Sequence, residues 1–336
     1  MRPEPALRIV FESPNVVGLQ TEEVKVDALG PTEVVIRTHV TVISPGTELA
    51  NLGDRMAMHT DQPRTFPIRH VGYANVGTVV ACGAALTVTP GDRVYSMGNH
   101  ASLVRIDAQD SFCVPVPDGL SDEQAVFVRF ANVSMTTLRT TMARAGDRVA
   151  VIGLGLVGNL AAQVFQASGM VVRAVDREAV RREVARQCGL QIVSGSPAAA
   201  GWSRQHRLVV EATGSAGALV DAIDLAQNGG EIVMVGAPWG GDRNSVPSSR
   251  ITRPVFDRFL RLRSGSEWEI PRQPDPFLSD SIRQNIDTGF RWLQDGSLKI
   301  EPLITHRIAP ESAPEAYQGL RDDPEKYLGV VIRWPS

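Results

Sequence analysis

Gly153 to Gly158 read GLGLVG and carry three glycines at the spacing Gly-x-Gly-x-x-Gly. An apolar run from Val149 to Ile152 precedes them, and a helical pattern follows. Asp176 stands at the end of the next predicted strand, 23 residues after Gly153. Glycines at these positions permit a tight turn, close approach of the backbone to a diphosphate, and close packing of helix on strand. The pattern predicts a dinucleotide site with the diphosphate at the helix N-terminus.

Asp176 indicates which dinucleotide binds. A carboxylate accepts hydrogen bonds from the ribose hydroxyls of NAD and repels the 2′-phosphate of NADP. Arg177 offsets part of that repulsion, so acceptance of NADP stays open, and Arg181 is within reach of the ribose one helical turn later. We therefore predict NAD; the alternative is that the glycines only pack a helix on a sheet. The predicted cofactor-binding residues are Gly153, Gly155, Leu156, Val157, Gly158, Asp176, Arg177, Arg181, Thr213, Val235, Gly236 and Ala237.

The composition is that of an ordinary globular chain. Its 336 residues are 43% hydrophobic and 21% charged, a length that favours about two domains. The net charge of -3 argues against nucleic acid as a partner. No apolar run approaches the roughly 18–20 residues that span a bilayer, and the first residues lack the apolar segment of a signal peptide. We therefore expect a cytoplasmic protein with a small-molecule substrate and no membrane partner.

Two patterns divide the chain. To about residue 115 the sequence is β-rich; Glu33 to Ile43, for example, alternates with the period of a half-buried strand. Ser121, with Gln124 three residues on, is a cap-like start to a helical stretch that continues to about Met142. Beyond it strands and helices alternate, which predicts an α/β fold with a doubly wound parallel sheet. The expected strands are 148–152, 171–176, 207–211, 231–235 and 258–263, and the expected helices are 159–167, 179–188 and 216–227.

Motifs in both halves resemble those of the medium-chain dehydrogenase/reductase superfamily, and the resemblance runs nearly end to end. The shared motifs are Gly46-Thr47-Glu48, Gly72–Gly77, Pro90–Val94, the glycine loop with Asp176, and Val235-Gly236-Ala237. The resemblance implies a GroES-like β-rich catalytic domain over residues 1–119 and a Rossmann domain over residues 120–268. It implies that residues 269–336 return to the catalytic domain and that the active site lies in the cleft between the domains. A homodimer through the last Rossmann strand is also implied.

The chain departs from the zinc-dependent members of that superfamily. Where they carry a Cys, a His and a third Cys or acidic ligand, this chain has Pro45, Tyr73 and, nearby, Arg129. Proline and arginine do not ligate zinc, and tyrosine is a poor substitute. The family's four clustered structural cysteines are missing as well. We therefore expect no metal, and similarity to the zinc-lacking branches that resemble bacteriochlorophyllide, sugar and cyclitol dehydrogenases.

Without zinc, a side chain must donate or accept the proton while a hydride moves to or from nicotinamide C4. Tyr73 is the first candidate because it takes a ligand position, and we expect a cation such as Arg129 to lower its pKa. Thr47 is second, because it matches the family's proton-relaying hydroxyl. Glu48 is expected to orient Tyr73 or pair with Arg129, and His70 is the reserve base. Each residue also has a purely structural interpretation. In that interpretation Tyr73 fills the void left by zinc and its ligand, Thr47 bonds the backbone at a turn, Glu48 forms an ion pair with Arg129, and His70 is a solvated or core histidine.

The family layout places four residues at the substrate: Arg129, Asn132, Trp239 and Trp268. Their mixture of aromatic faces and polar groups suits a sugar, a cyclitol or another polyhydroxylated molecule. The sequence thus predicts a zinc-independent, NAD-dependent dehydrogenase of a secondary alcohol, or a reductase of the matching ketone. Two alternatives stay open: an NAD(P)H-dependent reductase of an activated C=C bond or a quinone, and an NAD-binding protein without catalysis.

Overall fold

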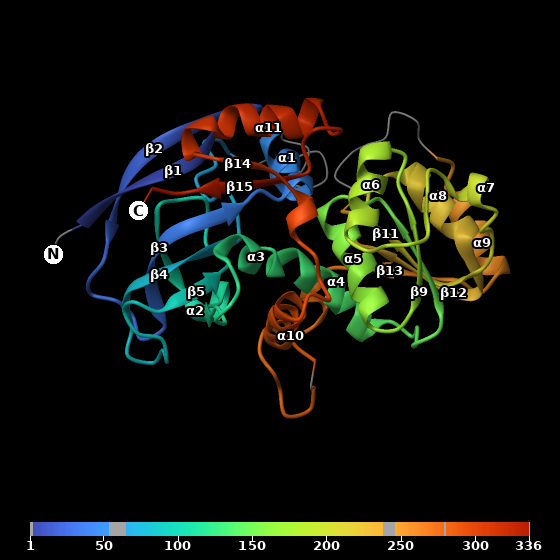
Figure 1. Ribbon diagram of the computed structural model, residues 1–336, viewed down its shortest axis with the longest axis horizontal. Coiled ribbons are helices and arrows are strands. Elements are labelled where there is room, and N and C mark those ends of the chain that lie inside the picture. Colours follow the sequence, from blue (N-terminus) through green and yellow to red (C-terminus); the bar gives the residue numbers. More distant parts are fainter. Residues whose placement is uncertain (1–2, 54–64, 238–245, 279, 336) are drawn as a thin grey trace. The chain divides into compact units, whose positions relative to one another are not determined.

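The computed structural model describes residues 3–53, 65–237, 246–278 and 280–335. Their contacts divide the chain into two compact units (Figure 1). Unit 1 comprises Met1–Arg129 and Ile304–Ser336, and unit 2 comprises Phe130–Leu303. Each unit contains buried apolar clusters of its own.

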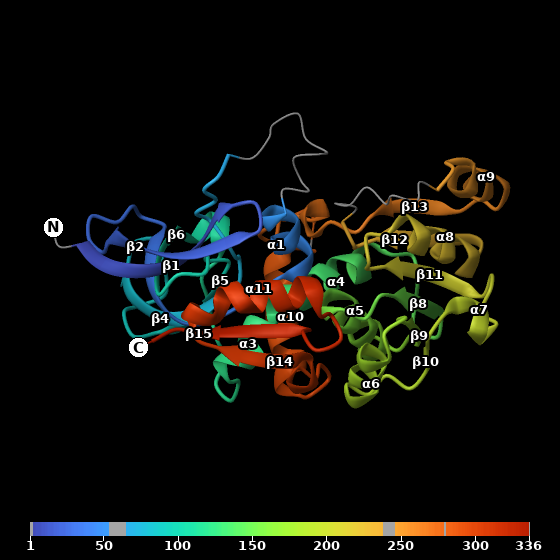
Figure 2. The ribbon, with the colours of Figure 1, turned by 90° about the horizontal axis from the view of Figure 1, so that it is seen from above.

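Unit 2 is built on a parallel sheet. Among its described residues, six strands pair in the order β10-β9-β8-β11-β12-β13, all in parallel register (Figure 2). The winding reverses between β8 and β11, and in doubly wound sheets ligands bind at such a reversal. The predicted α/β fold is confirmed. The strands are β8 (Arg148–Ile152), β9 (Val171–Val175), β10 (Val193–Ser194), β11 (His206–Glu211), β12 (Ala226–Met234) and β13 (Arg261–Ser264).

Helices cover both faces of this sheet, which explains why its central strands are almost continuously apolar. Val149 and Val151 of β8 pack on the α5 side, whereas Ala150 and Ile152 pack on the α8 side. Besides α4 (Val128–Thr140), the helices described in unit 2 are α5 (Leu156–Ala167), α6 (Ala179–Gln187), α7 (Pro197–Ala200), α8 (Ala216–Leu225), α9 (Ser249–Asp257) and α10 (Ile282–Gln294), with the 3-10 turns η2 (Glu267–Glu269) and η3 (Glu301–Leu303).

A buried polar network fixes α10 to α4 (Val128–Thr140) inside unit 2. Asn285 donates from Nδ2 to the Asn132 carbonyl at 3.3 Å and to Thr136 Oγ1 at 3.1 Å. Arg139 donates to Asn285 Oδ1 at 2.5 Å and to Asp280 at 2.8 Å. These bonds explain why α10 groups with unit 2. The junctions therefore follow residues 129 and 303, whereas the predicted boundaries follow residues 119 and 268.

Unit 1 is β-rich. Its described strands form a sheet in the order β14-β15-β3-β4-β5-β7, with β6 also paired to β3, and β1 and β2 form an antiparallel ribbon. Because β15 pairs with β3, residues from both ends of the chain share this sheet. The strands are β1 (Pro3–Ser13), β2 (Val16–Lys25), β3 (Glu33–Val42), β4 (Asn75–Cys82), β5 (Arg93–Ser96), β6 (Leu103–Asp107), β7 (Val114–Pro115), β14 (Ile304–Ile308) and β15 (Gly329–Arg333).

Two helices of unit 1 bear on the site described below. They are α1 (Pro45–Leu52) and α11 (Ala313–Asp322); α2 (Ala108–Ser111), α3 (Asp122–Val126) and the 3-10 turn η4 (Pro310–Ser312) complete the set described. Helix α11 lies along the β1–β2 ribbon (Figure 1) and buries its apolar face there. The ring of its Tyr317 stands edge-on to Phe11, with 5.2 Å between ring centroids. This core joins the C-terminal helix to the first strand.

Several element boundaries differ from the prediction. The helix predicted from Ser121 to Met142 is two helices, α3 and α4, separated at Phe127, although Ser121 and Gln124 do form the capping box. Strand β12 begins at Ala226, where the end of a helix was expected, because the chain turns extended there. The β1–β2 ribbon was missed, since β2 is mostly half-exposed and carries little alternation. Among the described residues, no helix is long and apolar enough to cross a membrane.

We predict that Asn285→Ala lowers the free energy of unfolding by about 1–3 kcal/mol, because Arg139 and Thr136 lose a buried partner. Urea denaturation followed by circular dichroism measures this change. Asp287→Ala on the same helix is the control, since Asp287 is exposed and pairs only with Arg283 among the contacts described. Its effect should stay within about 0.5 kcal/mol. Equal midpoints for the two variants would show that the network adds nothing to stability.

Candidate functional site

The glycine loop that follows β8 has the geometry of an anion cradle. Gly153 adopts a φ of +90°, and its N–H donates to the Val175 carbonyl at 2.8 Å. A Cβ at Gly158 would lie 1.8 Å from the Gly153 carbonyl oxygen, so only glycine fits there. Gly155 is the N-cap residue of α5, no side chain caps this helix, and a Cβ at Gly155 would meet open space. The helix N-terminus thus offers backbone N–H groups to a diphosphate.

Asp176 is held against this loop by backbone donors. Its Oδ2 accepts from Leu154 N at 2.7 Å, and its Oδ1 accepts from Glu178 N at 2.8 Å. The carboxylate is 5% exposed, and Arg181 Nη1 lies 3.8 Å from Oδ2. Arg177 is different: its side chain is 88% exposed and pairs with Glu178. Each oxygen of Asp176 keeps acceptor capacity for a ribose hydroxyl, in an orientation fixed before any ligand arrives.

A second turn, at the end of β11, depends on Glu211, which the sequence analysis did not single out. Its Oε1 accepts from Thr213 N at 2.6 Å and from Thr213 Oγ1 at 2.5 Å, and Gly214 N donates to the same carboxylate. Its carbonyl accepts from Val235 N and Gly236 N at 2.8 and 2.9 Å. Burial raises the pKa of Glu211 despite these donors. The sequence feature that could have indicated Glu211 is its position as the charged last residue of an apolar strand.

These observations test whether a dinucleotide fits unit 2. A Cβ on Gly236 would lie 2.2 Å from Gly214 N, so the turns that follow β11 and β12 pack backbone against backbone. The glycine loop, Asp176 and the turn that begins at Val235 follow the carboxyl ends of β8, β9 and β12, which belong to one parallel sheet. Ligands of doubly wound sheets bind at these ends. The residues present therefore fit a nicotinamide dinucleotide.

The hydroxyls named as acid–base candidates meet in unit 1. Tyr73 Oη donates to Ser44 Oγ, and the hydroxyl of Thr47 also bonds Tyr73. The guanidinium carbon of Arg129 lies 4.5 Å from the centre of the Tyr73 ring. Burial raises the pKa of Tyr73, and Arg129, Ser44 and Thr47 offset only part of this effect. The expected lowering by Arg129 is thus present, but burial outweighs it, so the phenol is protonated at neutral pH.

Behind this cluster lies a buried carboxylate, Glu48, which is 1% exposed. Its Oε1 accepts from Ser44 N at 2.7 Å, its Oε2 lies 3.1 Å from His100 Nε2, and Tyr317 Oη donates to Oε2. Glu48 is thus joined to Tyr73 through Ser44, whereas Arg129 lies over the Tyr73 ring. Sequence analysis missed Ser44, His100 and Tyr317 as site residues, although Ser44 lies two residues before the shared motif Gly46-Thr47-Glu48.

The remaining predicted residues are placed as follows. His70 is exposed, and its recorded partner is Asn99, at 3.3 Å, rather than Tyr73 or Thr47. Asn132 is buried in unit 2, where its Nδ2 donates to Glu267 at 2.5 Å. Trp268 is 52% exposed and contacts Arg272. Trp239 lies outside the described residues.

The described side chains do not assemble a zinc site. Across the described parts of the chain, no group of three His, Cys, Asp or Glu side chains could hold a metal ion. Glu48 and His100 are adjacent, but a phenol and a backbone N–H occupy the rest of the carboxylate. Pro45 and Arg129 supply no zinc ligand. The donor set in the described residues does not fit zinc.

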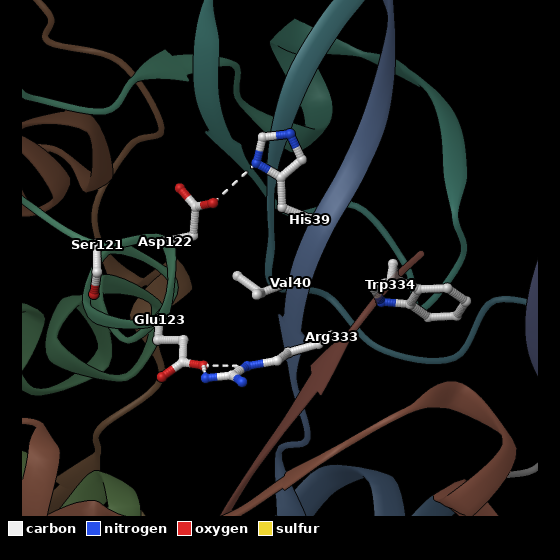
Figure 3. A pocket seen from close by; sticks show the side chains of 7 residues that line it. All are labelled: His39, Val40, Ser121, Asp122, Glu123, Arg333 and Trp334. Carbon is white, nitrogen blue, oxygen red and sulfur yellow. Dashed lines mark hydrogen bonds and ion pairs between the residues drawn. The ribbon is translucent and has the colours of Figure 1, made fainter. Parts of the chain in front are cut away.

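A shallow pocket elsewhere in unit 1 contains only paired charges (Figure 3). His39 Nδ1 lies 2.9 Å from Asp122 Oδ2, and Arg333 pairs with Glu123. The hydrogen bond with His39 and the nearby Arg93 hold the pKa of Asp122 below its ordinary value. These pairs fasten α3 to β3 and β15 and leave no unsatisfied charge for a ligand. The lining residues are His39, Val40, Ser121, Asp122, Glu123, Arg333 and Trp334.

Comparison with known proteins agrees with this geometry. Residues 157–258 match the family model described as "Zinc-binding dehydrogenase". The chain is 27% identical to L-threonine 3-dehydrogenase of Rhizobium etli, over 94% of this chain and 95% of the relative. It is 26% identical to D-guloside 3-dehydrogenase of Shigella flexneri, over 97% and 99%.

A solved structure extends the fold match to nearly the whole chain. Galactitol-1-phosphate dehydrogenase from Escherichia coli superposes with a TM-score of 0.79 at 19% identity, covering 97% of this chain and 99% of that one. The glycine loop, the motifs of both units and these end-to-end matches lead to one assignment: the chain belongs to the medium-chain dehydrogenase/reductase superfamily.

Proposed function

We propose that this protein is a zinc-independent, NAD-dependent dehydrogenase that transfers a hydride between nicotinamide and a secondary alcohol or the matching ketone. The observation that carries the proposal is the bonded set of hydroxyls at Tyr73, Ser44 and Thr47, beside Arg129. We further propose a sugar, a cyclitol or a similar polyhydroxylated substrate. The relatives named for D-guloside and galactitol 1-phosphate support that class.

Unit 2 supplies the residues that would hold the cofactor. The backbone around Gly155 would bind the diphosphate, Asp176 would bind the ribose hydroxyls, and the turns fixed by Glu211 would bind the nicotinamide end. Bound NAD would supply the hydride acceptor at nicotinamide C4. The chain itself must then orient the substrate and manage one proton.

Tyr73 is the proposed proton donor and acceptor. Because burial raises its pKa, it carries its proton at neutral pH and donates it from Oη to the carbonyl oxygen during ketone reduction. The phenolate left behind would face Arg129 and receive hydrogen bonds from the hydroxyls of Ser44 and Thr47. In alcohol oxidation the same atom takes the hydroxyl proton back. One side chain thus serves both directions, which is how general acid–base catalysis replaces a Lewis acid.

Zinc independence is part of the proposal. Its support is the donor set: a proline, a tyrosine and an arginine take the places at which zinc-dependent relatives bind the ion, and the described residues offer no other group of three ligands. We also propose a homodimer through β13, since it is one of the two edge strands of the described parallel sheet and such edges readily pair with another chain.

The direct test of the function incubates the purified protein with NAD and a panel of polyols while absorbance is followed at the NADH band. The proposal expects NADH to form with at least one secondary alcohol. NAD binding without turnover on any member would favour the non-catalytic alternative. Consumption of NADPH with a quinone or an activated alkene, and none with ketones, would favour the other alternative.

We predict that Tyr73→Phe lowers kcat by about 10²–10⁴-fold, because the variant keeps the ring but loses the proton. Steady-state kinetics on the alcohol found above measure this effect, and NAD affinity should be unchanged. Tyr327→Phe is a matched control, since Tyr327 is half-buried and stacks on His306 in the same unit. A Tyr73→Phe enzyme as fast as the control would remove Tyr73 from the proposed role.

We predict that Asp176→Ala weakens NAD binding relative to NADP binding, because the ribose hydroxyls lose an acceptor and the 2′-phosphate loses a repulsive charge. The ratio of the two dissociation constants, measured by calorimetry, is the readout. A loosening of the glycine loop after loss of the bond from Leu154 N would weaken both cofactors alike, so the ratio reports cofactor choice alone. Glu183→Gln on the exposed side of α6 is the control. A constant ratio would contradict the role given to Asp176.

A further inference from the structure

We infer that His100 and Tyr317 are positioning residues of the proposed dehydrogenase: they fix the Glu48 carboxylate and, through it, hold Ser44 against the Tyr73 hydroxyl. The inference rests on the proposed function and deepens it. All five side chains belong to unit 1, although Tyr317 stands on the C-terminal helix.

The side chain of Ser44 does not cap the helix that it precedes. It is the N-cap residue of α1, a position where a serine hydroxyl commonly accepts from the helix backbone, but its side chain makes no capping bond. Instead, Glu48 reaches back to bond Ser44 N at 2.7 Å. The backbone of Ser44 is therefore held by Glu48, and its hydroxyl is directed to Tyr73.

The buried Glu48 carboxylate needs hydrogen-bond donors from the protein. A carboxylate that is 1% exposed is costly unless hydrogen bonds replace the lost water. Among the described residues, the donors are Ser44 N, His100 and Tyr317. Burial and the adjacent Glu48 raise the pKa of Tyr317 well above its ordinary value, so its hydroxyl keeps the proton that it donates.

His100 acts as a fixed donor to this carboxylate. It is fully buried, and within the described residues its Nδ1 has no hydrogen-bond partner. The ring nitrogen that faces Glu48 is Nε2, and a carboxylate oxygen accepts, so Nε2 carries the proton of this hydrogen bond.

The backbone around His100 leads directly to Tyr73. His100 N donates to the Val71 carbonyl at 2.7 Å, and its carbonyl accepts from Ile9 N at 3.0 Å. The imidazole occupies the space where a side chain at Gly72 would begin: a Cβ there would lie 2.5 Å from the ring. Gly72 also has a φ of +82°, which favours glycine. The ring thus packs on the residue that precedes Tyr73.

The test follows Tyr73 itself. The sequence has four tyrosines, so incorporation of 3-fluorotyrosine gives four ¹⁹F NMR signals, which single Tyr→Phe variants assign. His100→Leu should shift the Tyr73 signal and leave that of Tyr327 in place, and His100→Gln, which keeps a donor near Nε2, should restore it. His306→Leu is the control, because it removes the ring stacked on Tyr327 and should move that signal alone.

Kinetics form the second readout. His100→Leu should lower kcat on the order of 10- to 100-fold with little change in KM, and His100→Gln should recover most of the rate. In a Tyr73→Phe background, His100→Leu should lower kcat no further, because His100 acts through the Tyr73 hydroxyl that this background lacks. If His100→Leu does not fold, Tyr317→Phe, which removes only a hydroxyl, takes its place in both readouts.

The outcomes separate this inference from the proposed function. A Tyr73 signal that stays in place in the folded His100 and Tyr317 variants overturns the inference, whatever the activity. Additive losses of kcat with Tyr73→Phe also overturn it. Full activity of Tyr73→Phe alone would overturn the proposed role of Tyr73 while leaving the NMR result to judge the positioning contacts.

Discussion

A carboxylate buried behind a ring of hydroxyls is the constraint around which unit 1 is arranged. Glu48 is nearly inaccessible to water, so the hydrogen bonds that water would give its carboxylate must come from donors in the fold. The donors come from the start of α1, the segment before β6 and helix α11. The chain must bring its C-terminal helix onto the first strands to complete the set. The same packing places Ser44, and therefore Tyr73, in one orientation.

In unit 2 the corresponding constraint is backbone packing. Glycines at 153 and 158 let α5 approach β8 so closely that a single methyl group would clash, and the open helix start that results can accept an anion. Asp176 and Glu211 then use their carboxylates to fix neighbouring loops by bonds to backbone N–H groups. The loops are set before a ligand binds, so the ordering cost of binding is reduced.

The sequence predicted the parts that depend on local pattern. The doubly wound sheet follows from the alternation of strands and helices. The spacing from Gly153 placed Asp176 at the end of the next strand, but the bond from Leu154 N to its carboxylate came from the structure. The sequence did not predict Tyr317, which lies 269 residues beyond Glu48 and looks in sequence like any core residue of an amphipathic helix. It also gave the wrong direction for the pKa of Tyr73, because burial is a property of the folded chain. Sequence analysis named His70 as the reserve base, whereas the histidine that packs on Gly72, next to Tyr73, is His100.

In the proposed mechanism, a tyrosine does in this protein what a zinc ion does in zinc-dependent members of its superfamily. The most direct measurement is the metal content of the active enzyme, determined by plasma mass spectrometry, with turnover recorded before and after exhaustive chelation. The account predicts far less than one zinc per chain and undiminished turnover. One zinc per chain, lost together with activity on chelation and restored with it, would contradict the account.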